Sequence, residues 1–458
     1  MENTSLQTLF ERQQLFFASG KTRALLFRRE ALKKLRSAIL MHEDELYEAL
    51  YKDLHKSPFE SYATEIGFVL DELRFHLKKL HKWVKPKKVS SSIVSFPARG
   101  YKTYEPLGTV LIIAPWNYPF QLMMAPLIGA ISAGNTIIIK PSEIAENTAL
   151  VIEKIINSSF EKEYIHVASG GVDVSQALLG FKFDHIFFTG SPRVGKIVMQ
   201  SAAKQMVPVT LELGGKSPCI VDETAPLKLT ARRIVWGKFL NAGQTCIAPD
   251  YLYVHEKVKE PLIKEMKEAI KKAYGEDAGK SPDFPRIITR ANMERLATLL
   301  DDTKIVYGGH YDKDEKYFEP TILDEVNFDL PVMQQEIFGP ILPVLTFKDT
   351  EKIIASINAH PRPLALYVFS KNNRFRKKII GGIPAGGVTV NDTLMHIASN
   401  RLPFGGVGNS GTGKYHGHFS FETFSNAKPV VYRGTWLDIP IRYAPYGKKL
   451  KIIKYLMH

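Results

Sequence analysis

Apolar residues recur at three- and four-residue steps through the first part of the chain. Between residues 5 and 54 they are interspersed with Arg and Lys, as at Leu25, Leu32 and Ile39, and a similar pattern covers 60–83. This spacing places the apolar side chains on one face of a helix. The first 83 residues are therefore predicted to be largely helical.

The pattern breaks at Lys85–Ser92 (Lys-Pro-Lys-Lys-Val-Ser-Ser-Ser), and alternating residues then run to Tyr104, which suggests a hairpin or arm. From Gly108 short apolar runs alternate with helical stretches. Strands are expected at 109–114, 136–139, 165–167, 185–188 and 207–213, and helices at 125–133, 150–160, 176–179 and 194–205. Such alternation is typical of a parallel α/β sheet with covered faces.

The second half repeats this pattern. Strands are expected at 219–221, 252–254, 365–369 and 388–390, and helices near 227–240, 256–273, 292–300 and 350–358. We therefore predict a second α/β domain over about 211–400. The chain beyond Arg401 is rich in Gly, Pro and aromatic residues and is expected to be extended.

The length of 458 residues favours two to four domains. The net charge of +14 has two interpretations: a solvated lysine-rich surface, or attraction to an anionic cofactor, membrane or nucleic acid. Part of the excess lies at Lys78–Lys88 and Lys448–Lys454. No nucleic-acid-binding module accompanies the charge, so nucleic acid is not an expected partner.

Two cysteines, Cys219 and Cys246, do not form a disulfide framework, and a cytoplasmic location is expected. The N-terminal sequence is not that of a signal peptide, and no stretch approaches the roughly twenty apolar residues of a membrane span. His416 and His418 are the only tight histidine pair, and neither HExxH nor paired CxxC occurs. No metal site is predicted.

Residues 187–196, Phe-Phe-Thr-Gly-Ser-Pro-Arg-Val-Gly-Lys, join an apolar strand to a helix. Backbone N–H groups at such a helix start suit a phosphate. As a P-loop, the segment has Ile197 where Ser or Thr would ligate magnesium. As a dinucleotide fingerprint, it has Pro192 in place of the middle glycine. An ordinary tight turn is the third interpretation.

Two further segments carry candidate chemistry. Val209–Gly215 predicts a strand on which Glu212 points away from the apolar face, either towards water or as a general base with a raised pKa. Cys246 follows a helix and a polar, glycine-containing loop, where nearby N–H dipoles could activate an accessible thiol. Cys219, beside Ile220 and Val221, is expected only to pack in the core.

Two strands end in polar residues. Asn117 follows the first strand of the sheet, where its amide could donate to an oxyanion or cap a turn before Pro119. Lys140 and Glu143 follow the second, where they could bind ribose hydroxyls or form a solvated turn. Ligands of parallel sheets bind at these carboxyl ends of the strands.

In chain order, the segments Pro-Trp-Asn, Lys-Pro-Ser-Glu, Phe-Thr-Gly-Ser, Leu-Glu-Leu-Gly-Gly-Lys, Gly-Gln-Thr-Cys, Glu-Ile-Phe-Gly-Pro and Leu-Pro-Phe-Gly-Gly-Val-Gly closely resemble the aldehyde dehydrogenase superfamily. The short N-terminus, Ala-Pro-Asp-Tyr after Cys246 and Tyr-His-Gly near residue 416 resemble its class 3 or fatty-aldehyde branch. The resemblance runs from about residue 5 to 430. It implies a variant Rossmann cofactor site, with which Pro192 is compatible.

The resemblance implies catalytic roles for three residues. Cys246 is the expected nucleophile that forms a thiohemiacetal and then a thioester. The Asn117 side chain and the Cys246 N–H are expected to hold the oxyanion. Glu212 is expected to activate the hydrolytic water.

The resemblance also implies a cofactor site. Lys140 and Glu143 are expected at the adenosine ribose, and Glu336 at the nicotinamide ribose. The other residues expected at the cofactor are Trp116, Gly190, Ser191, Gly195, Leu213 and Phe338. Glu143 would repel a 2′-phosphate and Lys140 would attract one, so the expected cofactor is NAD, with NADP possible.

The expected organisation has three parts and a tail: a cofactor domain (1–85 and 105–210), a catalytic domain (211–400) and a small β bridging arm (86–104 and 401–440) that pairs two subunits of a homodimer. The tail, 441–458, alternates basic and apolar residues. On a helix, Leu450, Ile453 and Met457 would share one face, which suits weak, peripheral contact with an anionic membrane. The alternative is a tail that is frayed or docked onto a protein partner.

The expected substrate is a medium- or long-chain aliphatic or an aromatic aldehyde, and an isoprenoid or carotenoid aldehyde also suits an apolar tunnel. The tunnel candidates are Tyr62, Tyr118, Trp236, Ile397 and Phe404. Alternative functions are an acylating enzyme that releases acyl-CoA, a catalytically silent binding protein and, from the P-loop interpretation of 187–196, a phosphate-hydrolysing protein. Glu212 argues against the first, because a water-activating base suits hydrolysis.

Overall fold

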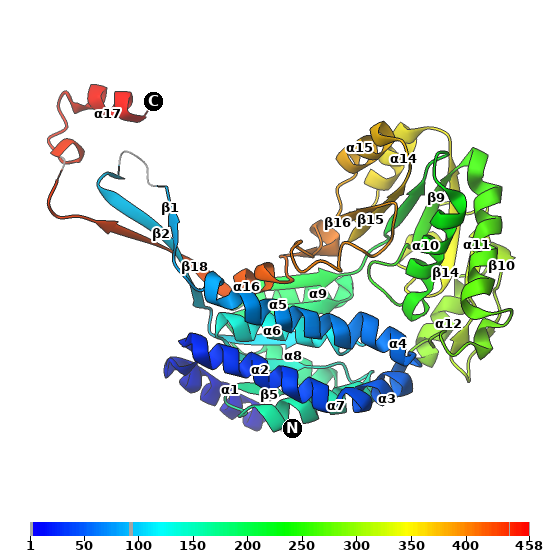
Figure 1. Cartoon of the computed structure of the whole chain (residues 1–458), viewed down its shortest axis with the longest axis horizontal. Coiled ribbons are helices and arrows are strands. Elements are labelled where there is room, and N and C mark those ends of the chain that lie inside the picture. Colours follow the sequence, from blue (N-terminus) through cyan, green and yellow to red (C-terminus); the bar gives the residue numbers. More distant parts are fainter. Residues whose placement is uncertain (1–2, 91–94, 439, 458) are drawn as a thin grey trace.

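The computed structural model describes residues 3–90, 95–438 and 440–457. Two α/β units lie side by side, and a narrow β arm projects from one of them (Figure 1). This mixed α/β architecture with two mainly parallel sheets confirms the predicted fold class.

The first unit is built on a six-stranded sheet in the order β17-β7-β6-β3-β4-β5. Its strands are β3 (Thr109–Ile113), β4 (Thr136–Lys140), β5 (Ile165–Val167), β6 (His185–Gly190), β7 (Val209–Leu213) and β17 (Gly411–Thr412). Its crossover helices are α6 (Gln121–Ala133), α7 (Glu146–Ser159), α8 (Val172–Leu179) and α9 (Pro192–Ala203). All neighbours are parallel except β17, which runs antiparallel to β7.

The N-terminal helices cover this unit (Figure 1). They are α1 (Asn3–Ala18), α2 (Leu25–Met41), α3 (Glu43–Leu54), α4 (Pro58–Ser61) and α5 (Gly67–Trp83), with a π-helical turn, η2 (Tyr62–Ile66), between α4 and α5. Leu32, Leu35 and Ile39 of α2 are fully buried, as their spacing predicts.

The second unit is built on a seven-stranded sheet in the order β10-β13-β14-β9-β8-β15-β16. The strands are β8 (Pro218–Val221), β9 (Tyr251–His255), β10 (Lys304–Tyr307), β13 (Thr321–Asp324), β14 (Ile341–Phe347), β15 (Ala365–Phe369) and β16 (Gly387–Val390). The helices are α10 (Leu227–Phe239), α11 (Lys259–Tyr274), α12 (Arg290–Thr298), α13 (Pro331–Gln334), α14 (Thr350–Asn358) and α15 (Asn373–Gly382), and β11 (Tyr311–Asp312) pairs with β12 (Tyr317–Phe318) outside the sheet.

The arm is a three-stranded antiparallel sheet of β1 (Lys87–Val89), β2 (Ala98–Pro106) and β18 (Ser425–Arg433). Helix α17 (Lys449–Met457) lies beyond its far end (Figure 1). Among the residues described, no helix is long and apolar enough to cross a membrane.

The segment 401–424, expected to be extended and part of the arm, lies instead within the first unit. Its strand β17 pairs with β7, and its helix α16 (His418–Thr423) packs on α6. Burial explains the difference, because Tyr415 and Phe421 are fully buried. Of the C-terminal part assigned to the arm, β18 is the portion that forms arm structure.

Candidate active site

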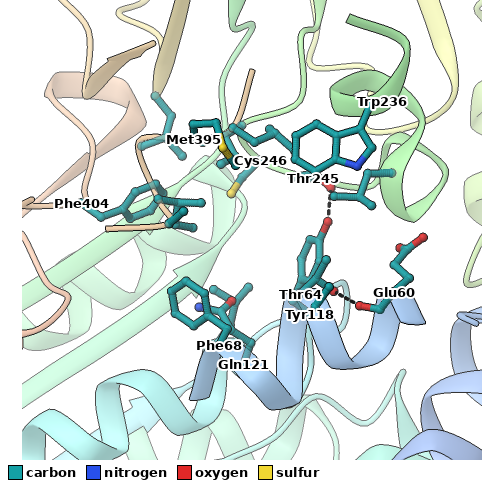
Figure 2. Close-up of a pocket in the computed structure, with 18 of the residues that line it drawn as sticks. Glu60, Thr64, Phe68, Tyr118, Gln121, Trp236, Thr245, Cys246, Met395 and Phe404 are labelled. Carbon is teal, nitrogen blue, oxygen red and sulfur yellow. Dashed lines mark hydrogen bonds between the residues drawn. The ribbon is translucent and has the colours of Figure 1, made fainter. Parts of the chain in front are cut away.

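A cavity of about 750 Å³ lies where the two α/β units meet. Its wall is mostly apolar, and both units contribute to it (Figure 2). Lining residues come from the α4–η2–α5 region, from the ends of β6 and β7, from α10 and from the segment 394–404. Cys246, Glu212 and Thr189 bring reactive or polar groups into this apolar space.

The loop after α10 places Cys246 on the cavity wall. Asn241 and Ala242 adopt left-handed backbone angles, with φ of 52° and 50°, and Gly243 follows with φ of 74°. A Cβ on Gly243 would lie 2.3 Å from the Gly339 carbonyl oxygen, so this tight turn requires glycine. Cys219, by contrast, is fully buried in β8, as predicted.

Asn117 holds the same loop from the first unit. Its Nδ2 donates to the Gln244 carbonyl oxygen at 2.9 Å, and its own carbonyl accepts from Asn241 Nδ2 at 2.8 Å. Next to it, Tyr118 does line the cavity, and its hydroxyl lies 2.6 Å from Thr245 Oγ1. The Asn117 amide carries a second hydrogen, which this bond leaves available.

A buried ion pair supports this junction. Lys56 Nζ lies 2.5 Å from Glu65 Oε1 and also donates to the Asn117 carbonyl oxygen at 3.2 Å. The other Glu65 oxygen accepts from the backbone N–H groups of Phe120 and Gln121. This pair could not be predicted from the sequence, because a Lys and a Glu near amphipathic helices have the same pattern as a solvated surface.

Glu212 lies on β7 directly beside Thr189 of β6, so both side chains project from the same face of the sheet. Its carboxylate is buried, and neither oxygen has a hydrogen-bond partner. Burial raises the pKa of Glu212 well above its usual value, and the positive charge of Lys414 offsets part of this rise. The carboxylate has room because Gly405 lacks a Cβ, which would lie 2.7 Å from Glu212 Oε1.

The Cys246 thiol is not activated in the protein alone. The N–H groups of Cys246 and Ile247 lower its pKa, which is the effect expected from the loop. Burial has the largest effect on the thiol, followed by the charges of Glu336 and Glu212. Together they outweigh the two N–H groups and raise the pKa of Cys246 to about 12. The dipoles of the loop therefore act in the expected direction, but burial and the two carboxylates are the larger effects on the thiol pKa.

The turn from β6 into α9 fits a dinucleotide phosphate. Ser191 is the N-cap of α9, and Pro192 occupies its first turn. A Cβ on Gly195 would lie 2.6 Å from Leu213 Cδ2, so glycine lets the start of the helix approach β7 closely. A Cβ on Gly190 would similarly lie 2.6 Å from the Phe188 ring.

Four other residues expected at a cofactor form two contacting pairs. Lys140 Nζ and Glu143 Oε2 form a 2.5 Å ion pair at the end of β4. The rings of Trp116 and Phe338 pack edge to face with centroids 5.4 Å apart. The ion pair could hold a ribose, the start of α9 a phosphate and the two rings an apolar ring, so the residues present suit a dinucleotide.

Glu336 lies against the glycine turn that follows Glu212. A Cβ on Gly214 would fall 2.0 Å from Glu336 Oε2, so this contact requires glycine. Burial and the charge of Asp250 raise the pKa of Glu336 to about 8, partly offset by a hydrogen bond from the Gly215 N–H. From the sequence alone, Glu336 could lie in a surface turn. The structure places its carboxylate near Cys246, whose pKa its charge raises.

Of the five tunnel candidates, Tyr118, Trp236, Ile397 and Phe404 line the cavity. Tyr62 does not: its side chain is 45% exposed, and its ring lies over Gly67. The π-helical turn η2 explains the difference, because its wider turn shifts the helix phase and directs Ala63 and Thr64 into the cavity. Several other residues line the cavity and were not predicted from the sequence, namely Phe59, Glu60, Thr64, Phe68, Gln121 and Met395.

Comparison with known proteins agrees with this geometry. Residues 17–430 match the model of the aldehyde dehydrogenase family. A 4,4′-diaponeurosporen-aldehyde dehydrogenase of Staphylococcus aureus is 49% identical over 451 residues, 98% of each chain. A dimeric, NADP-preferring aldehyde dehydrogenase of Canis lupus familiaris is 44% identical over 449 residues, 98% of this chain and 99% of the relative.

Among solved structures, the substrate-bound state of Staphylococcus aureus AldH superposes with a TM-score of 0.97 and covers 99% of both chains at 49% identity. The family model and these relatives span nearly the whole length of the chain. The chain therefore belongs to the aldehyde dehydrogenase family and is an NAD(P)-dependent oxidoreductase that acts on aldehydes.

Proposed function

We propose that the protein oxidises an apolar aldehyde to the carboxylic acid through a thioester on Cys246. The observation that carries the proposal is the cavity itself, in which one mostly apolar wall holds both the Cys246 thiol and the unpartnered Glu212 carboxylate. A nucleophile and a general base that share one largely apolar cavity suit covalent capture followed by hydrolysis.

The first step belongs to Cys246. Its thiolate attacks the aldehyde carbon, so that a C–S bond forms and the carbonyl electron pair moves onto oxygen. The Cys246 N–H and the free hydrogen of the Asn117 amide are the donors that hold this oxyanion. Hydride acceptance is the chemistry that bound NAD(P) supplies, and it leaves a thioester on Cys246.

Glu212 acts in the second step. Its carboxylate takes a proton from water while the water oxygen attacks the thioester carbon, and the C–S bond then breaks to release the acid. Because burial raises its pKa, Glu212 is a stronger base than an exposed carboxylate. Lys414, whose positive charge acts on the carboxylate, limits this rise.

For the cofactor we propose NAD, with NADP tolerated. Glu143 would repel a 2′-phosphate, while the Lys140 ammonium that would attract it is already paired with Glu143. The dog relative prefers NADP, so the choice needs a test. Initial rates with both cofactors should favour NAD, and Glu143→Gln should move the ratio towards NADP if this carboxylate sets the preference.

The product distinguishes hydrolysis from acyl transfer, and the rates with different aldehydes test the substrate class. The Staphylococcus relative is named for a diaponeurosporen-aldehyde, which agrees with an apolar cavity. We expect kcat/KM to rise with aldehyde chain length, and the product to be free acid with or without CoA. Glu212→Gln should accumulate the thioester, visible as an added mass on the intact chain. Formation of acyl-CoA would favour the acylating alternative.

The arm and tail suggest two kinds of association. We propose a homodimer formed through the arm, since the dog relative is named as dimeric. We also propose weak contact of α17 with an anionic membrane, because Leu450, Ile452 and Tyr455 are exposed among lysines. Of the predicted apolar face, Leu450 is exposed and Ile453 is half-buried, while the side chain of Met457 lies outside the described part of the structure. Liposome flotation with anionic lipid should weaken after deletion of 445–458, and an unchanged result would contradict the membrane contact.

A further inference from the structure

Glu60 is a buried carboxylic acid in the wall of an otherwise apolar part of the cavity. It lies on α4, behind the N-cap residue Ser57, and only 6% of it is exposed. Its neighbour Phe59 and the opposite residue Asp283 also line the cavity but are exposed, so they mark a rim. Figure 2 shows Glu60 on the Trp236 side of the cavity, away from Phe404.

One oxygen of Glu60 has a structural partner. Its Oε1 accepts from the Asn241 backbone N–H at 2.9 Å, which ties α4 to the turn before Cys246. The nearest positive charge, on Lys56, is already committed to Glu65 and the Asn117 carbonyl. Among the described residues, no cationic side chain forms an ion pair with Glu60, so Lys56 offsets its negative charge only in part.

We propose that Glu60 is a specificity-determining residue that excludes aldehydes carrying a negative charge at their far end. An extended aldehyde held at Cys246 and reaching towards the rim passes Glu60, where a distal carboxylate would meet a like charge in a water-poor space. Such pairs are strongly disfavoured when they cannot be solvated. This inference rests on the proposed function and refines its substrate class to neutral aldehydes.

A neutral aldehyde does not meet this charge repulsion, because it carries no charge and Glu60 can take up a proton. Burial raises the pKa of Glu60 to about 7; the charge of Lys56 opposes this rise, and those of Glu65 and Asp283 add to it. The other titratable groups nearby, Tyr118 and Tyr274, have pKa values raised by burial and stay neutral. Discrimination against anionic aldehydes should therefore strengthen as pH rises through 7 and weaken below it.

The test compares two aldehydes of equal length, an alkanal and its analogue with a terminal carboxylate. In Glu60→Gln the side-chain carbonyl can still accept from the Asn241 N–H, while the charge is removed. We expect the ratio of kcat/KM for the anionic aldehyde to that for the neutral one to rise by about tenfold or more. In wild type this ratio should fall as pH rises through 7, and in Glu60→Gln it should be flat.

Asp283→Asn is the matched control, because it removes the same charge from an exposed rim position where solvent screens it. Its ratio should change by less than about twofold. The role of Glu60 is overturned if Glu60→Gln leaves the ratio unchanged, or if the wild-type ratio does not vary with pH. Failure of wild type to oxidise either aldehyde would instead overturn the proposed function on which the inference rests.

Discussion

At the scale of single residues, the site contains several ionisable groups whose charged form is disfavoured by burial. Cys246, Glu212, Glu336 and Glu60 all have raised pKa values, and burial is the largest cause for each. In the free protein the thiol is therefore protonated at neutral pH. A bound oxidised nicotinamide carries a positive charge, which would lower the pKa of Cys246 by opposing the nearby carboxylates.

This arrangement predicts a pH profile for alkylation of Cys246. Because its pKa is raised to about 12, the rate with iodoacetamide should climb about tenfold per pH unit from pH 7 to about 10 without a plateau. Added NAD should increase the rate at a fixed pH. Cys219, which is fully buried, serves as the internal control and should stay unmodified in peptide mass maps. A plateau near neutral pH would contradict the raised pKa.

At the scale of elements, the sequence pattern predicted the strands of the first sheet from β3 to β7, because each is a short apolar run between glycines or helices. Strands β10, β13, β14 and β17 were not predicted. β10, β13 and β17 have few residues and no distinct periodicity, and β14 contains Pro343, which interrupts a strand pattern. The site was predictable where the residues form motifs, as at Cys246 and Glu212. It was not predictable for Glu60, Lys414 or Tyr62, because only the tertiary arrangement and the π-helical turn decide where these side chains lie.

The placement of β17 yields a prediction about Gly405. In Gly405→Ala the new Cβ would lie 2.6 Å from the Gly413 carbonyl oxygen and 2.7 Å from Glu212 Oε1, and the backbone cannot yield easily. We expect a loss of about 1–3 kcal/mol in unfolding free energy and a slower hydrolytic step.

Gly381→Ala, on α15 with nothing within 4 Å of its Cβ, is the matched control. It should change the unfolding free energy by no more than about 1 kcal/mol. Urea unfolding measures the change in unfolding free energy, and steady-state rates measure the slower hydrolytic step. Equal behaviour of the two variants would show that the β17 segment does not pack against Glu212 as described.

At the scale of the whole molecule, the arm leaves a long strand edge without a partner among the described residues. Strand β18 pairs with β2 on one side only, and Val431 and Tyr432 on it are exposed. Long exposed edges favour pairing with another chain, which supports the proposed dimer. The two α/β units, by contrast, meet around the cavity, where Asn117 of the first unit bonds to the loop that carries Cys246.

Val431→Lys should weaken this dimer, because it places a charge on an exposed apolar position of the edge strand. Size-exclusion chromatography with light scattering should show a shift from twice the chain mass towards one chain mass at low concentration. Leu150→Lys on α7 is the control, since Leu150 is similarly exposed (60%, against 65% for Val431) but lies far from the arm. A monomeric wild type, or equal masses for both variants, would contradict an interface at β18.

The central claim, that chemistry runs through Cys246, is tested most directly by NADH formation from a long-chain alkanal. Wild type, Cys246→Ala and Cys219→Ala should be compared under the same conditions, because the two variants remove the same thiol group from the cavity wall and from the core. We predict NADH from wild type and from folded Cys219→Ala, and none from Cys246→Ala. Full activity in Cys246→Ala would contradict the covalent mechanism.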